Sequence, residues 1–312
     1  MTQFSNHIIT FSALVLLLGS TLTFGQGQNE GEGVEAPPLE VAAGATYRGI
    51  YEEPVQLQGG VYVGPLFAPG AASRPRVELI RDFVVTGDLN DDGNEEAIVL
   101  LSESSGGSGT QLYMAVLGRS DDGAVNLGTA LVGDRIQVQA ARVSDGNVEL
   151  DVIQAGPDDA ACCPSEKATR KWTLKKDDLK ETGSDVTGRL SLADLVGPEW
   201  VLTHLTQTEE APAEPEVTLV FEDTRVSGSG GCNRFFAQVQ GGAPGELTIG
   251  PIGSTRRACP ETDMDLEQRY FKLLGGAVKY GFLVGRLVLT VRDSSGLGTM
   301  IFVRKDSPDT KN

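Results

Sequence analysis

The sequence predicts a mainly β protein built from two strand-rich domains. Its 312 residues exceed one domain of average size and suit two. Glycine supplies 39 of them, well above the usual share of about 7%, and this abundance indicates many turns between short strands. Apolar residues make up 40% of the chain and charged residues 22%, so the chain can bury substantial cores and carries too little charge for a disordered polyelectrolyte.

The N-terminus has the pattern of a secretory signal peptide. Residues 1–25 contain no Asp, Glu, Lys or Arg, and the apolar run from Ile8 to Phe24 reaches the small–x–small tripeptide Thr23-Phe24-Gly25. We expect cleavage near Gly25, a secreted or periplasmic protein, and no stable membrane insertion afterwards. The alternative is an uncleaved anchor helix, although the run is short for spanning about 30 Å of hydrocarbon and polar residues interrupt it.

The rest of the chain divides by composition. Residues 26–44 are rich in Gly, Glu, Pro and Ala, with four Glu and no basic residue, which predicts a flexible acidic tether. The expected parts after it are a β-rich domain over 45–175, a polar linker over 176–190, a second domain over 191–306 and a tail over 307–312.

Charge and histidine content exclude several functions. The chain has 26 basic and 43 acidic side chains, a net charge of −17, which argues against nucleic-acid partners and anionic membranes. The chain has two histidines, His7 and His204, and only His204 remains if the signal peptide is removed. One histidine is too few for a His-ligated zinc site, and His204 lies in a predicted strand. The sequence has no Gly-x-Ser-x-Gly elbow and no Gly-Lys-Ser/Thr phosphate loop. We therefore expect no enzyme; a hydrolase that uses carboxylates of the first domain is the alternative.

A β-hairpin is predicted within the first domain. Apolar residues alternate over 135–140 and again over 147–152. A three-residue loop over 144–146, with Gly146 left-handed, would place both apolar sets on one face. The expected cross-strand pairs are Val138 with Val152 and Ala140 with Leu150.

One loop of the first domain has the composition of a calcium site. The loop that joins two predicted strands carries oxygen-bearing side chains at alternate positions, and Gly93 within it allows a sharp turn. The missing glutamate at position 12, where Val99 stands, excludes an EF-hand, and the pattern resembles the strand–loop–strand sites of integrin-type repeats. The alternative is a turn rich in Asp and Asn that binds no ion. The candidate ligands for Ca²⁺ are Asp88, Asn90, Asp92, Asn94 (through its carbonyl) and Glu96.

The second domain contains one predicted helix among strands. Thr262 can cap the helix, with Asp263 and Asp265 in its first turn. An apolar stripe follows at helical spacing and indicates core packing. Its members are Leu266, Tyr270, Leu273 and Leu274. Alternating apolar residues over 217–221 and 287–291 predict strands.

Two motifs in this domain resemble a known family. The first is Ser229-Gly230-Gly231-Cys232-Asn233-Arg234-Phe235, and the second is Thr255-Arg256-Arg257-Ala258-Cys259. Their order, with the helix after them, resembles the META domain of the heat-shock HslJ family over about 192–305. The resemblance implies a small β-barrel with one packed helix, no enzymatic activity, and an association with stress response and the cell envelope. The family-motif residues are Gly231, Asn233, Arg234, Phe235, Thr255 and Arg256.

The four cysteines are even in number, which in an exported chain suggests disulfides, and three pairings are open. Cys232 and Cys259 lie in the two motifs of one domain, and we expect them to pair. Cys162 and Cys163 then pair with each other or stay reduced, as a loop staple or as a redox or metal-binding dithiol. The sequence as a whole predicts an exported, non-catalytic protein that binds an unknown protein or small molecule; an inhibitor or chaperone-like module is a further alternative.

Overall fold

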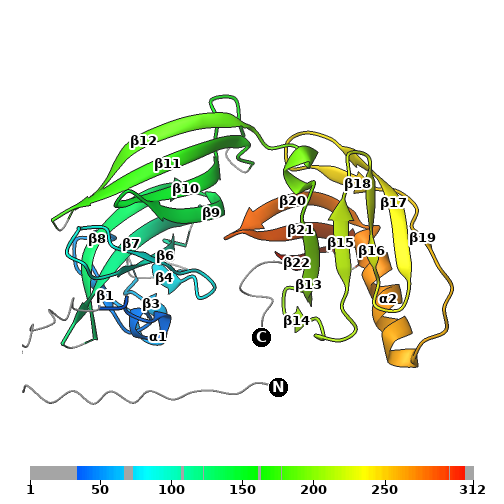
Figure 1. The fold of residues 1–312 in the computed structure, drawn as a ribbon, viewed down its shortest axis with the longest axis horizontal. Helices are drawn as coiled ribbons and strands as arrows, with labels where there is room; N and C mark the ends of the chain where they lie inside the picture. The colour runs from blue at the N-terminus through cyan, green and yellow to red at the C-terminus, as the bar shows by residue number, and fades with distance from the viewer. Residues whose placement is uncertain are drawn as a thin grey trace, which may run out of the picture. The chain divides into compact units, whose positions relative to one another are not determined.

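A computed structural model describes residues 34–66, 73–106, 109–121, 123–160, 163–176, 178–294 and 296–305. The chain is mostly β, as the sequence predicts (Figure 1). The signal peptide expected over 1–25 and the tail expected over 307–312 lie outside the described residues. Among the described helices, none combines the length and the apolar character that a membrane span requires.

Part of the segment expected to be a flexible tether belongs to the fold instead. Leu39–Ala42 form the short helix α1, and Ala42 and Ala43 are buried. The hydroxyl of Tyr47 donates to the carbonyl of Ala42 at 2.8 Å. Small alanines pack closely against the first strands, and this contact fixes residues that composition alone assigns to a tether.

The first large sheet has the order β3-β4-β6-β7-β8, with β5 paired to β6. Strand β6 reads as a continuous apolar run because both of its faces are buried: Ile98 and Leu100 pack on one face, and Val99 and Leu101 on the other. The strands are β3 Val61–Val63, β4 Arg76–Leu79, β5 Val85–Gly87, β6 Glu96–Ser104, β7 Gln111–Ser120 and β8 Gly123–Asp134. A separate two-stranded sheet consists of β1 Thr46–Tyr47 and β2 Val55–Gln56.

The second sheet has the order β12-β11-β10-β9 and corrects one expected boundary. Residues 178–189, within the expected linker, form the long edge strand β12, which is paired along its whole length with β11. The strand is polar because almost all of its side chains are exposed. The strands are β9 Gln137–Ser144, β10 Asn147–Gln154, β11 Glu166–Lys175 and β12 Asp178–Arg189.

The predicted hairpin forms with a different turn. Ser144 pairs with Asn147, so the loop has two residues, Asp145 and Gly146, both with positive φ. Asp-Gly is a favoured dipeptide for such turns. A bulge before Val152 then restores the expected pair of Val138 with Val152, whereas Leu150 pairs with Ala141 and not with Ala140. The register therefore depends on a bulge, which alternation of apolar residues does not reveal.

Asp159 fixes the loop between β10 and β11. Its carboxylate accepts hydrogen bonds from the N–H of Gly156 at 2.9 Å and from the N–H and hydroxyl of Ser165 at 2.7 Å each, and it pairs with Arg189 at 2.6 Å. The N–H of Gly156 and then the Ser165 hydroxyl lower the pKa of Asp159 to about 2. The ionised carboxylate is therefore the form that the folded loop stabilises.

Asp159→Asn is expected to destabilise the protein at neutral pH and much less at pH 2. A pKa lowered from its unfolded value, about 3.9, contributes stability that is present above that value and lost as pH falls through 2. Urea unfolding of wild type and variant between pH 2 and pH 6 measures the difference. The neighbouring exposed Asp158→Asn is the control, and an equal effect of both variants would contradict the role of Asp159.

The third sheet is nearly closed and has the order β18-β17-β16-β15-β13-β22-β21-β20. Its two end strands approach each other, because Glu246 bridges Lys279 and the N–H of Tyr280 donates to the carbonyl of Gly245 at 2.8 Å. The strands are β13 Glu199–Thr206, β14 Glu209–Glu210, β15 Thr218–Phe221, β16 Arg225–Ser229, β17 Arg234–Gly241, β18 Leu247–Ile249, β19 Gly253–Ser254, β20 Ala277–Leu283, β21 Arg286–Asp293 and β22 Gly296–Arg304. A short 3-10 helix, η1 Leu192–Leu195, precedes them.

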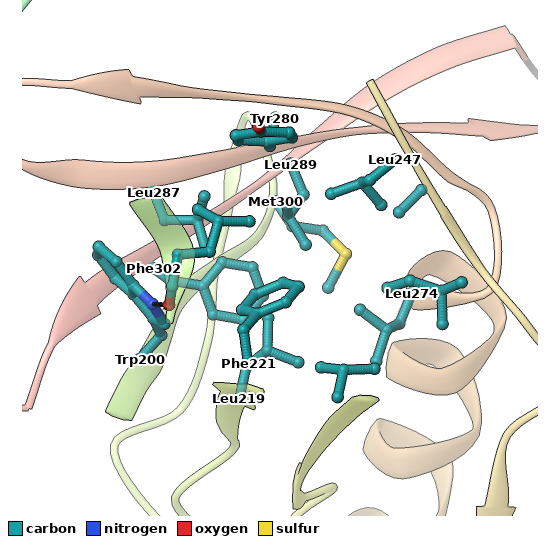
Figure 2. Close-up of a cluster of buried hydrophobic side chains, with 14 of the residues drawn as sticks. Trp200, Leu219, Phe221, Leu247, Leu274, Tyr280, Leu287, Leu289, Met300 and Phe302 are labelled. Carbon is teal, nitrogen blue, oxygen red and sulfur yellow. Dashed lines mark hydrogen bonds between the residues drawn. The ribbon is translucent and has the colours of Figure 1, made fainter. Parts of the chain in front are cut away.

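Helix α2, Glu261–Leu274, packs its apolar stripe into this sheet. Leu266, Tyr270 and Leu274 are buried, as predicted, and Leu273 is partly buried. Figure 2 shows Leu274 among the core side chains of the strands, which include Trp200 and Phe302. The helix begins earlier than expected, with Pro260 as its N-cap, so Thr262 lies inside the helix and caps nothing.

Candidate functional site

The two sequence motifs of the third sheet meet around the side chain of Asn233. The first motif joins β16 to β17, and the second follows β19, which pairs with β17. The N–H of Thr255 donates to the carbonyl of Arg234 at 3.0 Å, so the motifs lie side by side. Asn233 is 5% exposed, and its Oδ1 accepts from the Thr255 hydroxyl at 2.8 Å and from the N–H of Arg257 at 2.7 Å.

Helix α2 completes this polar cluster through Glu267. The Asn233 side-chain amide donates to Glu267 Oε1 at 2.9 Å, and the Asn233 backbone N–H donates to Oε2. Glu267 is buried although it is a carboxylate. It is not among the residues that the motifs single out; a charge inside the apolar stripe of the helix is the signal that could have found it. Buried polar groups that are fully paired rigidify a fold, so the cluster fixes the motifs to the helix.

Glycines allow the close approach of the first motif to the helix. A Cβ on Gly230 would lie 2.8 Å from Phe271 and 2.9 Å from Glu267. Gly231 has φ of 101°, a conformation that side chains rarely adopt. Phe235 packs its ring edge-on against Tyr270 and Phe271, with centroids 5.7 and 5.2 Å apart. The first motif therefore has a packing role in this domain: its glycines, Asn233 and Phe235 are each required by the local backbone or by a contact.

The disulfide between Cys232 and Cys259 joins the same two motifs. Its Cα atoms are 5.9 Å apart, and the two cysteines are separated by 27 positions. The amide of Asn233 donates to Cys232 Sγ at 3.3 Å. The expected pairing is thus present and contacts the polar cluster directly. Cys163 is disulfide-bonded as well, whereas Cys162 lies outside the described residues.

A comparison with family models decides the identity of this region. The model described as META domain matches residues 193–307. This region is a META domain. The two motifs and the helix that follows them therefore belong to the family that their residues resemble.

Solved structures with a similar chain were also found. An NMR structure of a protein from Burkholderia xenovorans is 22% identical, covering 37% of this chain and 87% of its own, with a TM-score of 0.29. A second NMR structure is 20% identical, covering 36% of this chain and 93% of its own, with a TM-score of 0.29. No curated protein matches the chain.

The META domain presents a charged cavity beside its first motif. The cavity has a volume of about 440 Å³ and is lined by Arg234 and Phe235 together with Glu199 and Glu216. Lys305 pairs with Glu216 at 2.7 Å and with Glu199 at 3.2 Å. Arg234 is exposed at this surface, and Arg256 is exposed as well. Both arginines, with Thr255 and Arg257 of the second motif, are therefore exposed to a partner.

The Asp88 loop lies between β5 and β6 of the first sheet and is closed by its own side chains. Asp88 accepts from the N–H of Asn90 at 3.2 Å and from that of Gly93 at 2.9 Å. Asn90 Oδ1 accepts from the N–H of Asp92 at 2.9 Å, and Asp92 Oδ1 accepts from the N–H of Asn94 at 2.8 Å. This ladder of short-range bonds is the geometry of an Asp- and Asn-rich turn.

Electrostatics of the loop centre on Glu96. It is 2% exposed, and it accepts from the N–H of Leu89 at 2.8 Å and from the amide of Asn90 at 3.0 Å. Burial raises the pKa of Glu96, and the charges of Asp92 and Asp88 raise it further, against the hydrogen bond from Leu89. Burial alone would raise the pKa of Asp88. Hydrogen bonds from backbone N–H groups, chiefly those of Gly93 and Asn90, outweigh burial and lower this pKa overall.

The loop brings the predicted ligands into one turn, but their carboxylates do not converge on a common point. Within the described ranges, no group of three or more His, Cys, Asp or Glu side chains is arranged to hold a metal ion. The Asn94 side chain is occupied at both ends, because its Oδ1 accepts from the N–H of Val34 at 3.0 Å and its amide donates to Asp92 Oδ1 at 2.9 Å. Its backbone carbonyl is the group that the calcium prediction requires. Calcium binding by this loop stays a prediction.

Proposed function

We propose that the chain is an exported, non-catalytic calcium-binding protein whose META domain contacts an envelope partner. The observation that carries the calcium proposal is Glu96, a buried carboxylate whose pKa is raised by burial and by the charges of Asp92 and Asp88. Three carboxylates then share one turn. A bound cation would offset their repulsion, and Ca²⁺ accepts six to eight oxygen ligands in flexible arrangements.

The disulfide of the META domain supports export. Disulfides persist in oxidising compartments such as the periplasm and the extracellular space, and they are rare in the cytosol. Cys232 and Cys259 are bonded within the domain. This agrees with the signal peptide expected over 1–25.

The surface of the META domain supports the binding role. Arg234 lines the charged cavity beside the first motif. In a chain of net charge −17, the exposed arginines of the two adjoining motifs, Arg234, Arg256 and Arg257, favour a partner that presents acidic groups. The partner is a protein or a small molecule with that chemistry.

Calcium at 10 mM is expected to raise the melting temperature. Extracellular calcium modules bind with Kd on the order of 10⁻⁴–10⁻³ M. Calcium at 10 mM is a roughly 10- to 100-fold excess over such a Kd, so a ligand that binds only the folded form stabilises it by about 1.4–2.7 kcal/mol. With an unfolding entropy of about 2.1 cal/mol/K per residue, that corresponds to a shift of roughly 2–5 °C for a chain of this length. Calorimetry in Ca²⁺, in Mg²⁺ and in EGTA measures it, and Mg²⁺ should substitute poorly.

Two variants separate an ion site from a turn. Asp88→Asn keeps a side-chain oxygen for the N–H of Gly93 but removes a charge, so the calcium-dependent shift should disappear. Asp91→Asn is the matched control, because Asp91 is exposed and accepts no hydrogen bond from the loop ladder. A melting temperature of the wild type that does not respond to calcium would show that the loop is only a turn.

A further inference from the structure

A buried carboxylate lies at the end of β6. Glu103 is 5% exposed and stands in register between Val77 of β4 and Gln111 of β7. Its face of the sheet is the one that carries Leu101 and Val99 into an apolar core. A charged side chain in such a position is rare unless it has a partner of opposite charge.

The hydrogen bonds of Glu103 use only one of its two oxygens. Oε1 accepts from the hydroxyl of Tyr51 at 2.8 Å and from the hydroxyl of Ser105. Among the residues that the structure describes, none donates to Oε2, and no Lys, Arg or His forms an ion pair with the carboxylate. One oxygen and the full negative charge are thus available to a ligand.

Three tyrosines surround this carboxylate. The rings of Tyr51 and Tyr62 have centroids 6.4 Å apart and are tilted by 47°. Tyr62 lies in the same cross-strand row as Glu103, with Val77 between them. Tyr113 stands opposite Leu101, two residues from Glu103 along β6. All three tyrosines are half-buried, so the cluster reaches the surface.

The carboxylate of Glu103 contributes to raising the pKa values of two of these phenols, Tyr51 and Tyr113. Burial, and after it the hydrogen bond and charge of Glu103, raise the pKa of Tyr51. Burial and then the charge of Glu103 raise the pKa of Tyr113. Both phenols therefore stay neutral, and their rings keep the electron-rich faces that attract cations.

We propose that Glu103, together with Tyr51, Tyr62 and Tyr113, binds a protonated primary amine. An ammonium N–H donates to Oε2, and the aromatic faces contact the charge and the adjoining methylene groups. A primary amine fits better than a quaternary one because its N–H groups can donate to Oε2. The same chemistry is offered by a free alkylamine and by a lysine side chain of a partner protein.

Titration of the full chain with n-butylammonium tests the site. Calorimetry should detect binding to the wild type and at least tenfold weaker binding to Glu103→Gln. The glutamine retains an oxygen for the Tyr51 and Ser105 hydroxyls, so the fold should persist. Glu78→Gln, on the neighbouring strand and already paired with Arg76, is the matched control and should bind as the wild type does. Equal binding to both variants would overturn the proposal.

Two further comparisons define the recognition. Tyr62→Phe should retain binding, because it keeps the aromatic ring and loses only the hydroxyl. Tyr62→Leu should weaken binding several-fold, because it removes the ring face that contacts the cation. Tetramethylammonium, which has no N–H, should bind more weakly than n-butylammonium. A lysine-containing peptide that binds more tightly than the free amine would identify a protein partner, and the reverse order would identify a small amine. No binding by any of these probes would refute the site.

Discussion

Asn233→Ala is expected to lower the free energy of unfolding by about 3–5 kcal/mol. The substitution leaves the Thr255 hydroxyl, the Arg257 N–H and one oxygen of Glu267 without their partner. Most of the cost comes from Glu267, because a buried polar group that loses its partner costs about 1–3 kcal/mol, and more when it is charged. Denaturant unfolding measures the change, and Gln238→Ala on the exposed face of β17 is the control, with an expected effect within about 0.5 kcal/mol.

Asn233→Asp distinguishes lost hydrogen bonds from lost volume. It keeps the side-chain shape but places a carboxylate where the amide now donates to Glu267. Two carboxylates in contact raise each other's pKa, so the variant should lose stability, relative to wild type, as pH rises above about 4. A small and pH-independent loss in this variant would show that Glu267 does not depend on the Asn233 amide.

Removing the disulfide is expected to cost about 3.5 kcal/mol in the chain-entropy account. The double variant Cys232→Ser, Cys259→Ser avoids leaving a reactive thiol, and the bond that it removes spans 27 positions. Reduction of the wild type should produce a similar loss, which unfolding curves with and without reductant measure. Peptide mapping that finds Cys232 joined to another cysteine would contradict the assignment on which the expected loss rests.

The stability losses from Asn233→Ala and from removal of the disulfide should not be additive. The disulfide fixes the loop at Cys232 to the segment that leads into α2, and the Asn233–Glu267 contacts fix the same loop to α2 itself. Asn233 also donates to Cys232 Sγ. Residues that share partners in this way have coupling energies of about 0.5–3 kcal/mol. The triple variant measures the coupling between the two cross-links directly.

Much of the META domain could be predicted because its signals are local. The strand patterns over 217–221 and 287–291 and the helical stripe of α2 depend on spacings of two and of three to four residues. The first domain was harder, because a polar edge strand such as β12 has the composition of a linker. Alternation of apolar residues predicts the wrong hairpin turn, because the bulge that sets the register leaves no mark in that alternation.

Sites whose residues are far apart in the chain are harder to predict from the sequence. The Asp88 loop is continuous in the chain, so its candidate ligands follow from their spacing alone. Asn233 was recognised as a motif residue, but its partner Glu267 lies 34 positions away on another element. Glu103 and Tyr51 are 52 positions apart, a contact that no spacing along the chain predicts.

The first and last strands of the META sheet, β13 and β22, are neighbours at its centre. Trp200 pairs with Arg304 in antiparallel register, so the chain enters and leaves the domain at the same place. A module with this property can be transplanted into a surface loop of another protein without forcing the ends of that loop apart. It can also be circularly permuted: a short connection between the neighbourhoods of Trp200 and Arg304 would let new termini open at the turn between β17 and β18.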